Sequence, residues 1–159
     1  MTTIMEIEYR KGDATSPLKS GNKIIVHVCN DIGGWGRGFV MAISKKWKQP
    51  EERFRNWYSS KENFALGEVQ LVKVEEDIWI ANLIGQHDIK ADRNGIPPIR
   101  YDAVSKGLNK IAGMTIQFKA TIHMPRIGCG LAGGNWEEME KIVIKELIDK
   151  GVSVTVYDL

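Results

Sequence analysis

Two glycine-rich segments in equivalent places constrain this chain more than any other feature of its sequence. The first, Asn30 to Gly38, follows the apolar and β-branched run 23–29, and the second, Arg126 to Asn135, follows the short apolar run 121–125. A helical pattern of apolar residues begins after each segment. In open α/β sheets, the turn between a strand and the next helix lies at the carboxyl edge, where ligands usually bind. The sequence therefore predicts two ligand-facing loops.

Short strands and helices alternate along the rest of the chain. Residues 69–75 and 78–84 form a predicted strand pair that turns at Glu76 and Asp77. Helices interleaved with apolar strands indicate an α/β layered domain with a mixed sheet. No repeat or linker interrupts the pattern, so we expect one domain over residues 1–159. The expected strands are 5–9, 23–29, 69–75, 78–84, 121–125 and 152–156, and the expected helices are 39–44, 51–58, 100–113 and 136–150.

Composition excludes several classes of protein. The 22 basic and 20 acidic residues give a net charge of +2, so there is no general electrostatic reason to bind a polyanion, and any anion site must be local. Cys29 and Cys129 lack the spacing and the neighbouring histidines of a zinc site, so we expect reduced thiols and no metal or cofactor. No run approaches the roughly 20 apolar residues of a membrane span, so we expect no membrane partner. Glu6, Glu8 and Arg10 interrupt the apolar pattern of a signal peptide, so we expect a cytoplasmic protein, and we also expect a monomer.

The glycine segments have the chemistry of an anion site. Glycine adopts positive φ and lets a ligand approach backbone N–H groups, and the N-terminus of the following helix favours phosphate. Two such loops can hold a diphosphate between them, although a single glycine run is more often only a tight turn. Neither segment contains the Gly-Lys-Ser/Thr of a phosphate-binding loop, and neither is a dinucleotide fingerprint with a later acidic residue.

At these residues the chain resembles the macro domain family, and the resemblance extends from Tyr9 to Tyr157. It rests on Gly12-Asp13-Ala14-Thr15, on 25–30, on 33–39, on 125–134 and on the last strand, 156–159. The resemblance implies a three-layer α/β fold, with a central mixed β-sheet flanked by helices, and an ADP-ribose cleft. It also implies that Asp13 hydrogen-bonds the adenine and that Asn30 faces the distal ribose. The implied ligand-binding residues are Asp13, Ala14, Asn30, Gly34, Trp35, Gly36, Arg37, Gly38, Gly128, Cys129, Gly130, Leu131, Ala132, Gly133 and Tyr157.

The motif details are similar to one branch of the family, which contains ADP-ribose-1″-phosphate phosphatases and terminal ADP-ribose protein glycohydrolases. The glycohydrolases attack with a lysine after the fourth strand and resolve with an aspartate in the second loop. The matching places here hold Gln86 or His87, and Ala132. The resemblance implies hydrolysis of an ADP-ribose derivative. A non-catalytic ADP-ribose reader and an α/β domain with an unrelated nucleotide ligand are the alternatives.

Three polar residues are the candidate catalytic groups if the ligand lies as the family implies: Asn30, Asp31 and His87. Asp31 or His87 is suited to act as a general base on water, since histidine as a residue type exchanges protons near neutral pH. The alternative for Asp31 is a cap on its own loop. Trp35 either forms a wall of the distal-ribose pocket or holds the loop down. The open-ended cleft of the family also admits an ADP-ribosylated macromolecule.

Overall fold

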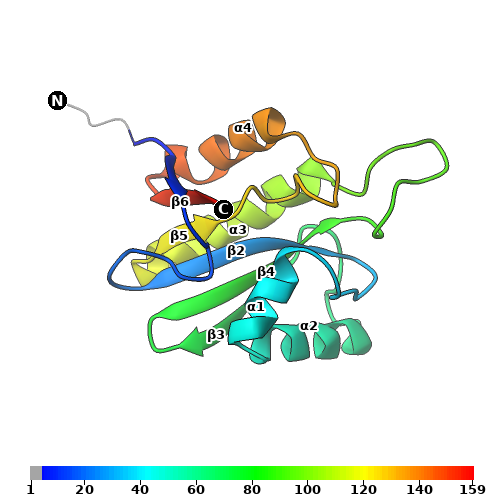
Figure 1. Ribbon diagram of the computed structural model, residues 1–159, viewed down its shortest axis with the longest axis horizontal. Helices are drawn as coiled ribbons and strands as arrows, with labels where there is room; N and C mark the ends of the chain where they lie inside the picture. Colours follow the sequence, from blue (N-terminus) through cyan, green and yellow to red (C-terminus); the bar gives the residue numbers. More distant parts are fainter. Residues whose placement is uncertain (1–4) are drawn as a thin grey trace.

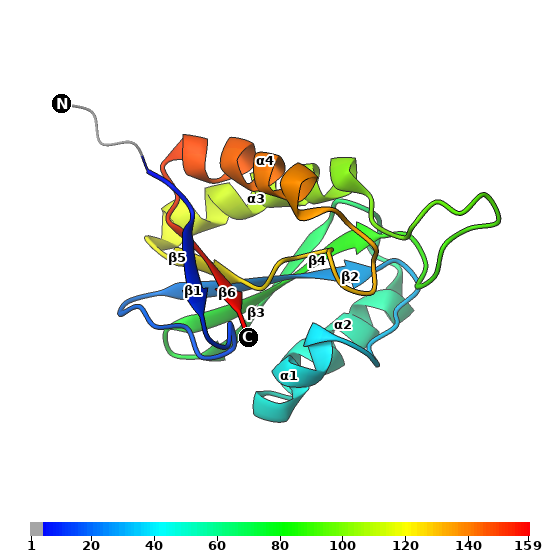
Figure 2. The same cartoon turned by 45° about the horizontal axis from the view of Figure 1, so that its top comes forward.

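The computed structural model describes residues 5–159 as a six-stranded sheet between two layers of helices (Figure 1). The strands are β1 (Glu8–Lys11), β2 (Lys23–Asn30), β3 (Val69–Glu75), β4 (Ile78–Gln86), β5 (Thr121–Met124) and β6 (Val154–Asp158). The helices are α1 (Phe39–Lys46), α2 (Gln49–Ser60), α3 (Tyr101–Phe118) and α4 (Trp136–Glu146), with a 3₁₀ turn η1 (Ile148–Lys150). Helices α1 and α2 lie on one face and α3 and α4 on the other, as the turned view also shows (Figure 2). The expected three-layer α/β fold is confirmed.

The order of the strands creates a crevice in the middle of the sheet. The order is β1-β6-β5-β2-β4-β3, and only β3 runs antiparallel to its neighbour. After β2 the chain passes through α1, α2 and β3 to β4 on one side, whereas after β5 it passes through α4 to β6 on the other side. Adjacent parallel strands whose connections leave in opposite directions form a topological switch point, where open α/β sheets bind ligands.

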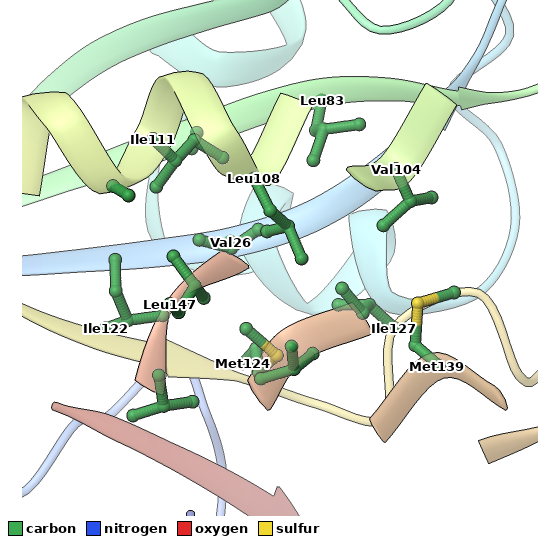
Figure 3. Packing of buried hydrophobic residues seen from close by; sticks show 14 of the residues in the cluster. Val26, Leu83, Val104, Leu108, Ile111, Ile122, Met124, Ile127, Met139 and Leu147 are labelled. Carbon is green, nitrogen blue, oxygen red and sulfur yellow. The ribbon is translucent and has the colours of Figure 1, made fainter. Parts of the chain in front are cut away.

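Strand β2 is buried on both faces because its side chains alternate between two cores. Ile24 and Val26 belong to the core beneath α3 and α4, which Figure 3 shows from close by. Ile25 and Cys29 belong to the core beneath α1 and α2. The expected central strand is therefore confirmed, and the glycine segment that follows it is held at the edge of both cores.

Several element ends differ from the expected ones. The first and last strands lie about two residues later than expected, because they pair in parallel from Glu8 opposite Thr155 to Lys11 opposite Asp158. Helix α3 does not stop at Gly113 but continues to Phe118, whose ring packs 5.2 Å from that of Trp79. The last helical segment is divided into α4 and η1, and Gly151 ends it at φ 83° as expected. None of the helices in residues 5–159 is long and apolar enough to cross a membrane.

Candidate functional site

The carboxyl ends of the five parallel strands collect the predicted site residues along one edge of the sheet. In spatial order this edge carries the segment after β1 with Asp13, the end of β6, the second glycine segment after β5, the first glycine segment after β2, and Gln86 at the end of β4. Four spacings of ~4.8 Å make this edge roughly 19 Å long. The site is therefore elongated, with the Asp13 segment at one end and the β4 end at the other.

Asn30 shapes the first glycine segment with its own side chain. Its Oδ1 accepts hydrogen bonds from the backbone N–H groups of Ile32 and Gly34, at 3.1 and 2.8 Å, and its Nδ2 donates to the Gly34 carbonyl at 3.0 Å. Gly33 adopts φ 75°, and a Cβ atom there would lie 2.4 Å from the ring of Tyr58. The sequence predicted Asn30 as a ligand and catalytic residue; the structure shows that it first organises the loop.

Trp35 holds this loop against the helices. The side chain is only 5% exposed, its ring lies 5.5 Å from Phe54 and 5.3 Å from His27, and its Nε1 donates to Ser44 Oγ at 2.8 Å. Of the two expected roles, the structure thus shows that Trp35 anchors the loop. Part of the residue also lines a cavity that is described below.

The second glycine segment is a compact turn with one protruding side chain. Gly128 and Gly133 adopt φ 72° and 77°, and the Gly134 N–H donates to the Gly128 carbonyl at 2.7 Å. Backbone of the segment also accepts a bond from Ile99 at the Ala132 carbonyl. Leu131 is 60% exposed and reaches toward the first segment, where a Cβ atom on Gly38 would lie 3.7 Å from it. The two glycine segments therefore face each other across the switch point.

Two adjoining cavities occupy the space between these segments. The inner one, about 250 Å³, lies between the two glycine segments, and the outer one, about 490 Å³, lies along the first segment toward α2. Three arginines line them, and no carboxylate from residues 5–159 does. The residues shared by both cavities are Val28, Arg37, Val40, Gln86 and Leu131. We call the two cavities together the cleft.

The three arginines differ in whether a carboxylate of the protein already binds their guanidinium group. Arg126, in the inner cavity, makes two hydrogen bonds to Asp158, at 2.7 and 3.0 Å, which raise its pKa further, and its guanidinium lies over the rings of Tyr9 and Trp136. Arg37 is exposed and has no hydrogen-bond or ion-pair partner among the described residues. Arg55, in the outer cavity, is bonded to Glu51. Arg37 is thus the cation most available to a ligand.

Most of the predicted ligand-binding residues line the cleft, and others do not. Those that line it are Asn30, Gly34, Trp35, Gly36, Arg37, Gly38, Gly128, Gly130, Leu131 and Ala132. The predicted ligand-binding residues outside its lining are Asp13, Ala14, Cys129, Gly133 and Tyr157. The candidate catalytic residues Asp31 and His87 also lie outside it. The lining residues that the sequence did not predict as ligand contacts include Val28, Arg55, Ile89 and Arg126. The sequence could have indicated Arg126, because it is the first residue of the second glycine segment. No sequence pattern indicates that Arg55, on α2, reaches the cleft.

Asp31 and His87 form a hydrogen-bonded pair at the rim of the cleft. His87 Nδ1 lies 2.7 Å from Asp31 Oδ2, and Asp31 Oδ1 accepts from the Asp88 N–H at 2.8 Å. The side chains are 19% exposed for Asp31 and 56% for His87. The expectation that Asp31 caps its own loop is therefore wrong: its carboxylate joins the loop after β2 to the loop after β4. Asp31 follows Asn30 in the sequence and His87 follows Gln86, and both Asn30 and Gln86 line the cleft.

At the other end of the edge, Asp13 lies in a tight turn with a free carboxylate oxygen. Its Oδ1 accepts from the N–H and the hydroxyl of Thr15 at 2.8 and 2.7 Å, whereas Oδ2 has no hydrogen-bond donor within residues 5–159. Partial burial raises the pKa of the Asp13 carboxyl, but the bonds from Thr15 outweigh it and hold the pKa below its usual value. Lys46 Nζ, which also lowers that pKa, donates to the Thr15 carbonyl at 2.7 Å and ties α1 to this turn.

Tyr157 supports the Asp13 segment from behind. It is only 4% exposed, its hydroxyl accepts from the Leu18 N–H at 3.2 Å, and its ring would lie 3.6 Å from a Cβ atom on Gly12. The same hydroxyl lies 2.8 Å from Nδ1 of the buried His123. Burial raises the pKa of Tyr157 and lowers that of His123 to about 4. The aromatic side chain predicted to contact adenine is thus packed beneath the loop in this structure.

The two cysteines carry free thiols, and both are withdrawn from solvent to different degrees. Burial raises the pKa of the Cys29 thiol well above its usual value, and it raises that of Cys129 despite the nearby guanidinium of Arg126. A thiol with a raised pKa is a poor nucleophile at neutral pH. The described residues contain no cluster of three histidine, cysteine, aspartate or glutamate side chains that could hold a metal ion.

Solved structures with this fold cover almost the whole chain. A Bacteroides thetaiotaomicron protein of unknown function is 62% identical, with a TM-score of 0.97, and the match covers 99% of this chain and 100% of the other. A macrodomain protein from Streptomyces coelicolor is 46% identical, with a TM-score of 0.87, over 97% and 99%. A Thermosipho africanus DarTG structure in complex with ADP-ribose is 19% identical, with a TM-score of 0.69, over 87% and 38%, and shows the same fold.

Curated relatives fall into two groups. The Danio rerio chromodomain-helicase-DNA-binding protein 1-like is 32% identical over an alignment of 160 positions, which covers 95% of this chain and 15% of that protein. The ADP-ribose 1″-phosphate phosphatase of Candida albicans is 28% identical over an alignment of 145 positions, which covers 84% of this chain and 89% of that enzyme. The chain spans less than a fifth of the length of the Danio rerio and Mus musculus chromodomain-helicase relatives. No family model matches the sequence.

The fold and the site define an α/β domain with a cation-lined cleft at a topological switch point. The identity to the Streptomyces coelicolor structure, over nearly the full length of both chains, completes the identification. The chain belongs to the macrodomain family. The resemblance seen in the sequence is thus confirmed.

Proposed function

We propose that the cleft binds ADP-ribose or a derivative of it. The observation that carries the proposal is the pair of glycine segments facing each other across a cleft with three arginines and no lining carboxylate from residues 5–159. Backbone N–H groups in glycine loops and guanidinium groups both bind phosphate oxygens. The Candida albicans phosphatase and the DarTG structure in complex with ADP-ribose support the choice of ligand.

The order of groups along the sheet edge gives the proposed ligand a direction. Asp13, with its free carboxylate oxygen, is suited to accept a hydrogen bond from the adenine amino group at one end. The diphosphate then lies between the glycine segments, and the distal ribose lies in the outer cavity beside Asn30 and Arg37. Because Ile89 and Leu131 are 53% and 60% exposed, the rim is open, and the proposal extends to ADP-ribose attached to a larger chain.

Calorimetric titration with ADP-ribose, with ADP and AMP as controls, tests the binding proposal. We expect a dissociation constant on the order of micromolar for ADP-ribose, which corresponds to about 8 kcal/mol of binding free energy. ADP should bind less tightly and AMP least tightly, since each lacks groups that would contact the cleft. Equal affinity for AMP and ADP-ribose, or no binding of either, would exclude this ligand class.

We further propose that the chain hydrolyses its ligand, with ADP-ribose-1″-phosphate as the first candidate substrate. The Asp31–His87 pair supports this, because a histidine oriented by a carboxylate is suited to take a proton from an attacking water. The water oxygen attacks the phosphorus, the bond between phosphorus and the 1″ oxygen breaks, and that oxygen takes up the proton that His87 has removed from the water, so that inorganic phosphate and ADP-ribose are released. A reader that binds ADP-ribose without turnover is the alternative, and the absence of a lysine at Gln86 and His87 favours it over a lysine-dependent glycohydrolase.

Phosphate release from ADP-ribose-1″-phosphate separates the two alternatives. If the pair is the base, Asp31→Asn and His87→Gln should each lower kcat by about 100-fold or more. Calorimetry on the same samples shows whether they still bind ADP-ribose. Tight binding without any phosphate release by the unaltered protein would identify a reader.

A further inference from the structure

The outer cavity ends at a closed ring of hydrogen bonds that contains Arg55. Trp35 Nε1 donates to Ser44 Oγ at 2.8 Å, and Ser44 Oγ donates to Glu51 Oε1 at 3.1 Å. Arg55 Nε then donates to Glu51 Oε2 at 2.9 Å, and Arg55 Nη2 donates back to the Trp35 carbonyl at 3.5 Å. The ring connects the first glycine segment, α1 and α2, so Arg55 is fixed relative to the loop that lines the cavity.

This ring leaves part of the Arg55 guanidinium without a partner among residues 5–159. Arg55 lines the outer cavity together with Arg37, and it also borders a neighbouring surface hollow. Its carboxylate partner Glu51 borders only that hollow and does not line the outer cavity. The bonds of Arg55 within residues 5–159 use Nε and Nη2, which leaves Nη1 without a partner there. A planar guanidinium held on one side in this way presents its remaining N–H groups in a fixed direction.

Its place along the sheet edge indicates which part of a ligand Arg55 would meet. Of the two cavities of the cleft, Arg126 lines only the inner one, Arg37 lines both, and Arg55 lines only the outer one. The Asp13 segment follows β1, at the opposite end of the strand order. A ligand whose adenine lies at Asp13 and whose diphosphate lies between the glycine segments therefore points its far end toward Arg55.

We propose that Arg55 is a specificity-determining residue that binds a phosphate group on the distal ribose, with Glu51 and Ser44 as positioning residues. This inference rests on the proposed binding of ADP-ribose in the cleft. A neutral distal ribose satisfies neither Arg37 nor Arg55, whereas a phosphate monoester offers oxygens to both guanidinium groups. The cleft would thus prefer the phosphorylated form of its ligand.

Matched ligands and matched variants test the role of Arg55. The ligands are ADP-ribose and its 1″-methylene phosphonate, which carries the same kind of anion but cannot be hydrolysed. The variants are Arg55→Gln and Arg53→Gln, because Arg53 lies on the same helix but lines the cavity on the β3 side. Both variants remove one positive charge from α2, so a general electrostatic effect would appear in both. Thermal unfolding of each variant checks that the fold is intact.

We expect the unaltered protein to bind the phosphonate at least about tenfold more tightly than ADP-ribose, as one charge-assisted contact allows. Arg55→Gln should weaken phosphonate binding by about tenfold more than ADP-ribose binding, and Arg53→Gln should change neither. Glu51→Gln should reduce the preference in part, because it loosens the guanidinium without removing it.

Three results would overturn the inference, and they are distinguishable. Binding of ADP-ribose without preference for the phosphonate would remove the phosphate subsite but leave the proposed function intact. Equal weakening of both ligands by Arg55→Gln would show that Arg55 acts only by supporting Trp35 and its loop. Binding of neither ligand by the unaltered protein would overturn the proposed function, and the subsite with it.

Discussion

Single side chains decide how each end of the cleft is built, and Asp13 is the clearest case. One of its carboxylate oxygens is occupied by Thr15, and the other has no donor among the described residues. The bound oxygen fixes the orientation of the free one, so the turn prepares an acceptor before any ligand arrives. Because the two oxygens have different roles, a substitution can remove the free acceptor and still keep the hydrogen bonds that form the turn.

Asp13→Asn should weaken ADP-ribose binding while it preserves the loop. The amide oxygen can still accept from Thr15, but the other atom becomes a donor and faces the adenine amino group with the wrong polarity. We expect a loss of about 1.5–3 kcal/mol, which is roughly 10- to 100-fold in the dissociation constant. Calorimetry measures the affinity, and Thr15→Val serves as the control that loosens the turn but keeps the carboxylate. Unchanged affinity in Asp13→Asn would remove the adenine role.

Residue types alone indicated chemistry but not orientation. The sequence placed Asn30, Asp31 and Trp35 in a ligand-facing loop, and the loop is where it was expected. Yet the side chain of Asn30 forms hydrogen bonds with the backbone of Ile32 and Gly34, and the side chain of Trp35 is buried. The direction of a side chain depends on partners such as Phe54 and Ser44, which are distant in sequence, so no local pattern reveals it.

At the level of elements, the second glycine segment contains two glycines with opposite roles. A Cβ atom on Gly134 would lie 2.3 Å from the Gly128 carbonyl oxygen, whereas a Cβ atom on Gly130 would meet nothing within 4 Å. Gly130 lines the inner cavity, so its missing side chain is space for the ligand. Gly134 is required by the fold of the turn itself.

Gly130→Val should therefore weaken ADP-ribose binding with little loss of stability, whereas Gly134→Ala should chiefly lower the stability of the fold. The valine fills part of the inner cavity, and we expect ADP-ribose affinity to fall at least about tenfold with little change in Tm. The alanine forces the turn apart, at a cost of about 1–3 kcal/mol in the free energy of unfolding. Thermal unfolding and calorimetry on both variants measure the two effects. Tight binding by Gly130→Val would mean that the segment is only a turn.

Elements were predictable where the periodicity of apolar residues determined them, and less so at their ends. Strands β2, β3 and β4 and helix α1 begin at the expected residues, because burial on one or both faces sets their pattern. Helix α3 passes Gly113, since the buried Thr115 and the ring of Phe118 pack beyond it. Arg55 reaches the cleft only because α1 and α2 fold back beside the first glycine segment, which depends on the tertiary fold.

At the level of the whole molecule, two neighbouring strands of the central sheet, β2 and β5, each contain a buried histidine. His27 Nε2 lies 2.5 Å from Asn82 Oδ1, and His123 lies between Thr121 and Tyr157. Burial lowers the pKa of His27 to about 4, partly offset by the bond to Asn82. Burial, together with the positive charges of Lys23 and Lys19, lowers the pKa of His123 to about 4. Both side chains are therefore neutral in the folded protein at pH 5 and above.

This pair of histidines should make the free energy of unfolding fall as the pH drops from 7 to 5. In the unfolded chain each histidine binds a proton as the pH passes through about 6.5, whereas in the folded protein it does so only near pH 4. Between these values the unfolded state holds more protons, so acidification favours it. The carboxyls with lowered pKa values, such as Asp13 and Asp158, lose their stabilising contribution only at lower pH.

Urea unfolding at pH 7, 6 and 5 measures this dependence. We expect a loss on the order of 1–2 kcal/mol for each histidine between pH 7 and pH 5. His123→Asn should reduce the pH dependence of the free energy of unfolding by the contribution of one histidine. This holds whatever the substitution does to the stability at pH 7, because the slope against pH depends on the number of protons bound in each state and not on packing. A stability that is flat or rises toward pH 5 would show that the two rings bind protons in the folded state, which the closed packing around β2 and β5 opposes.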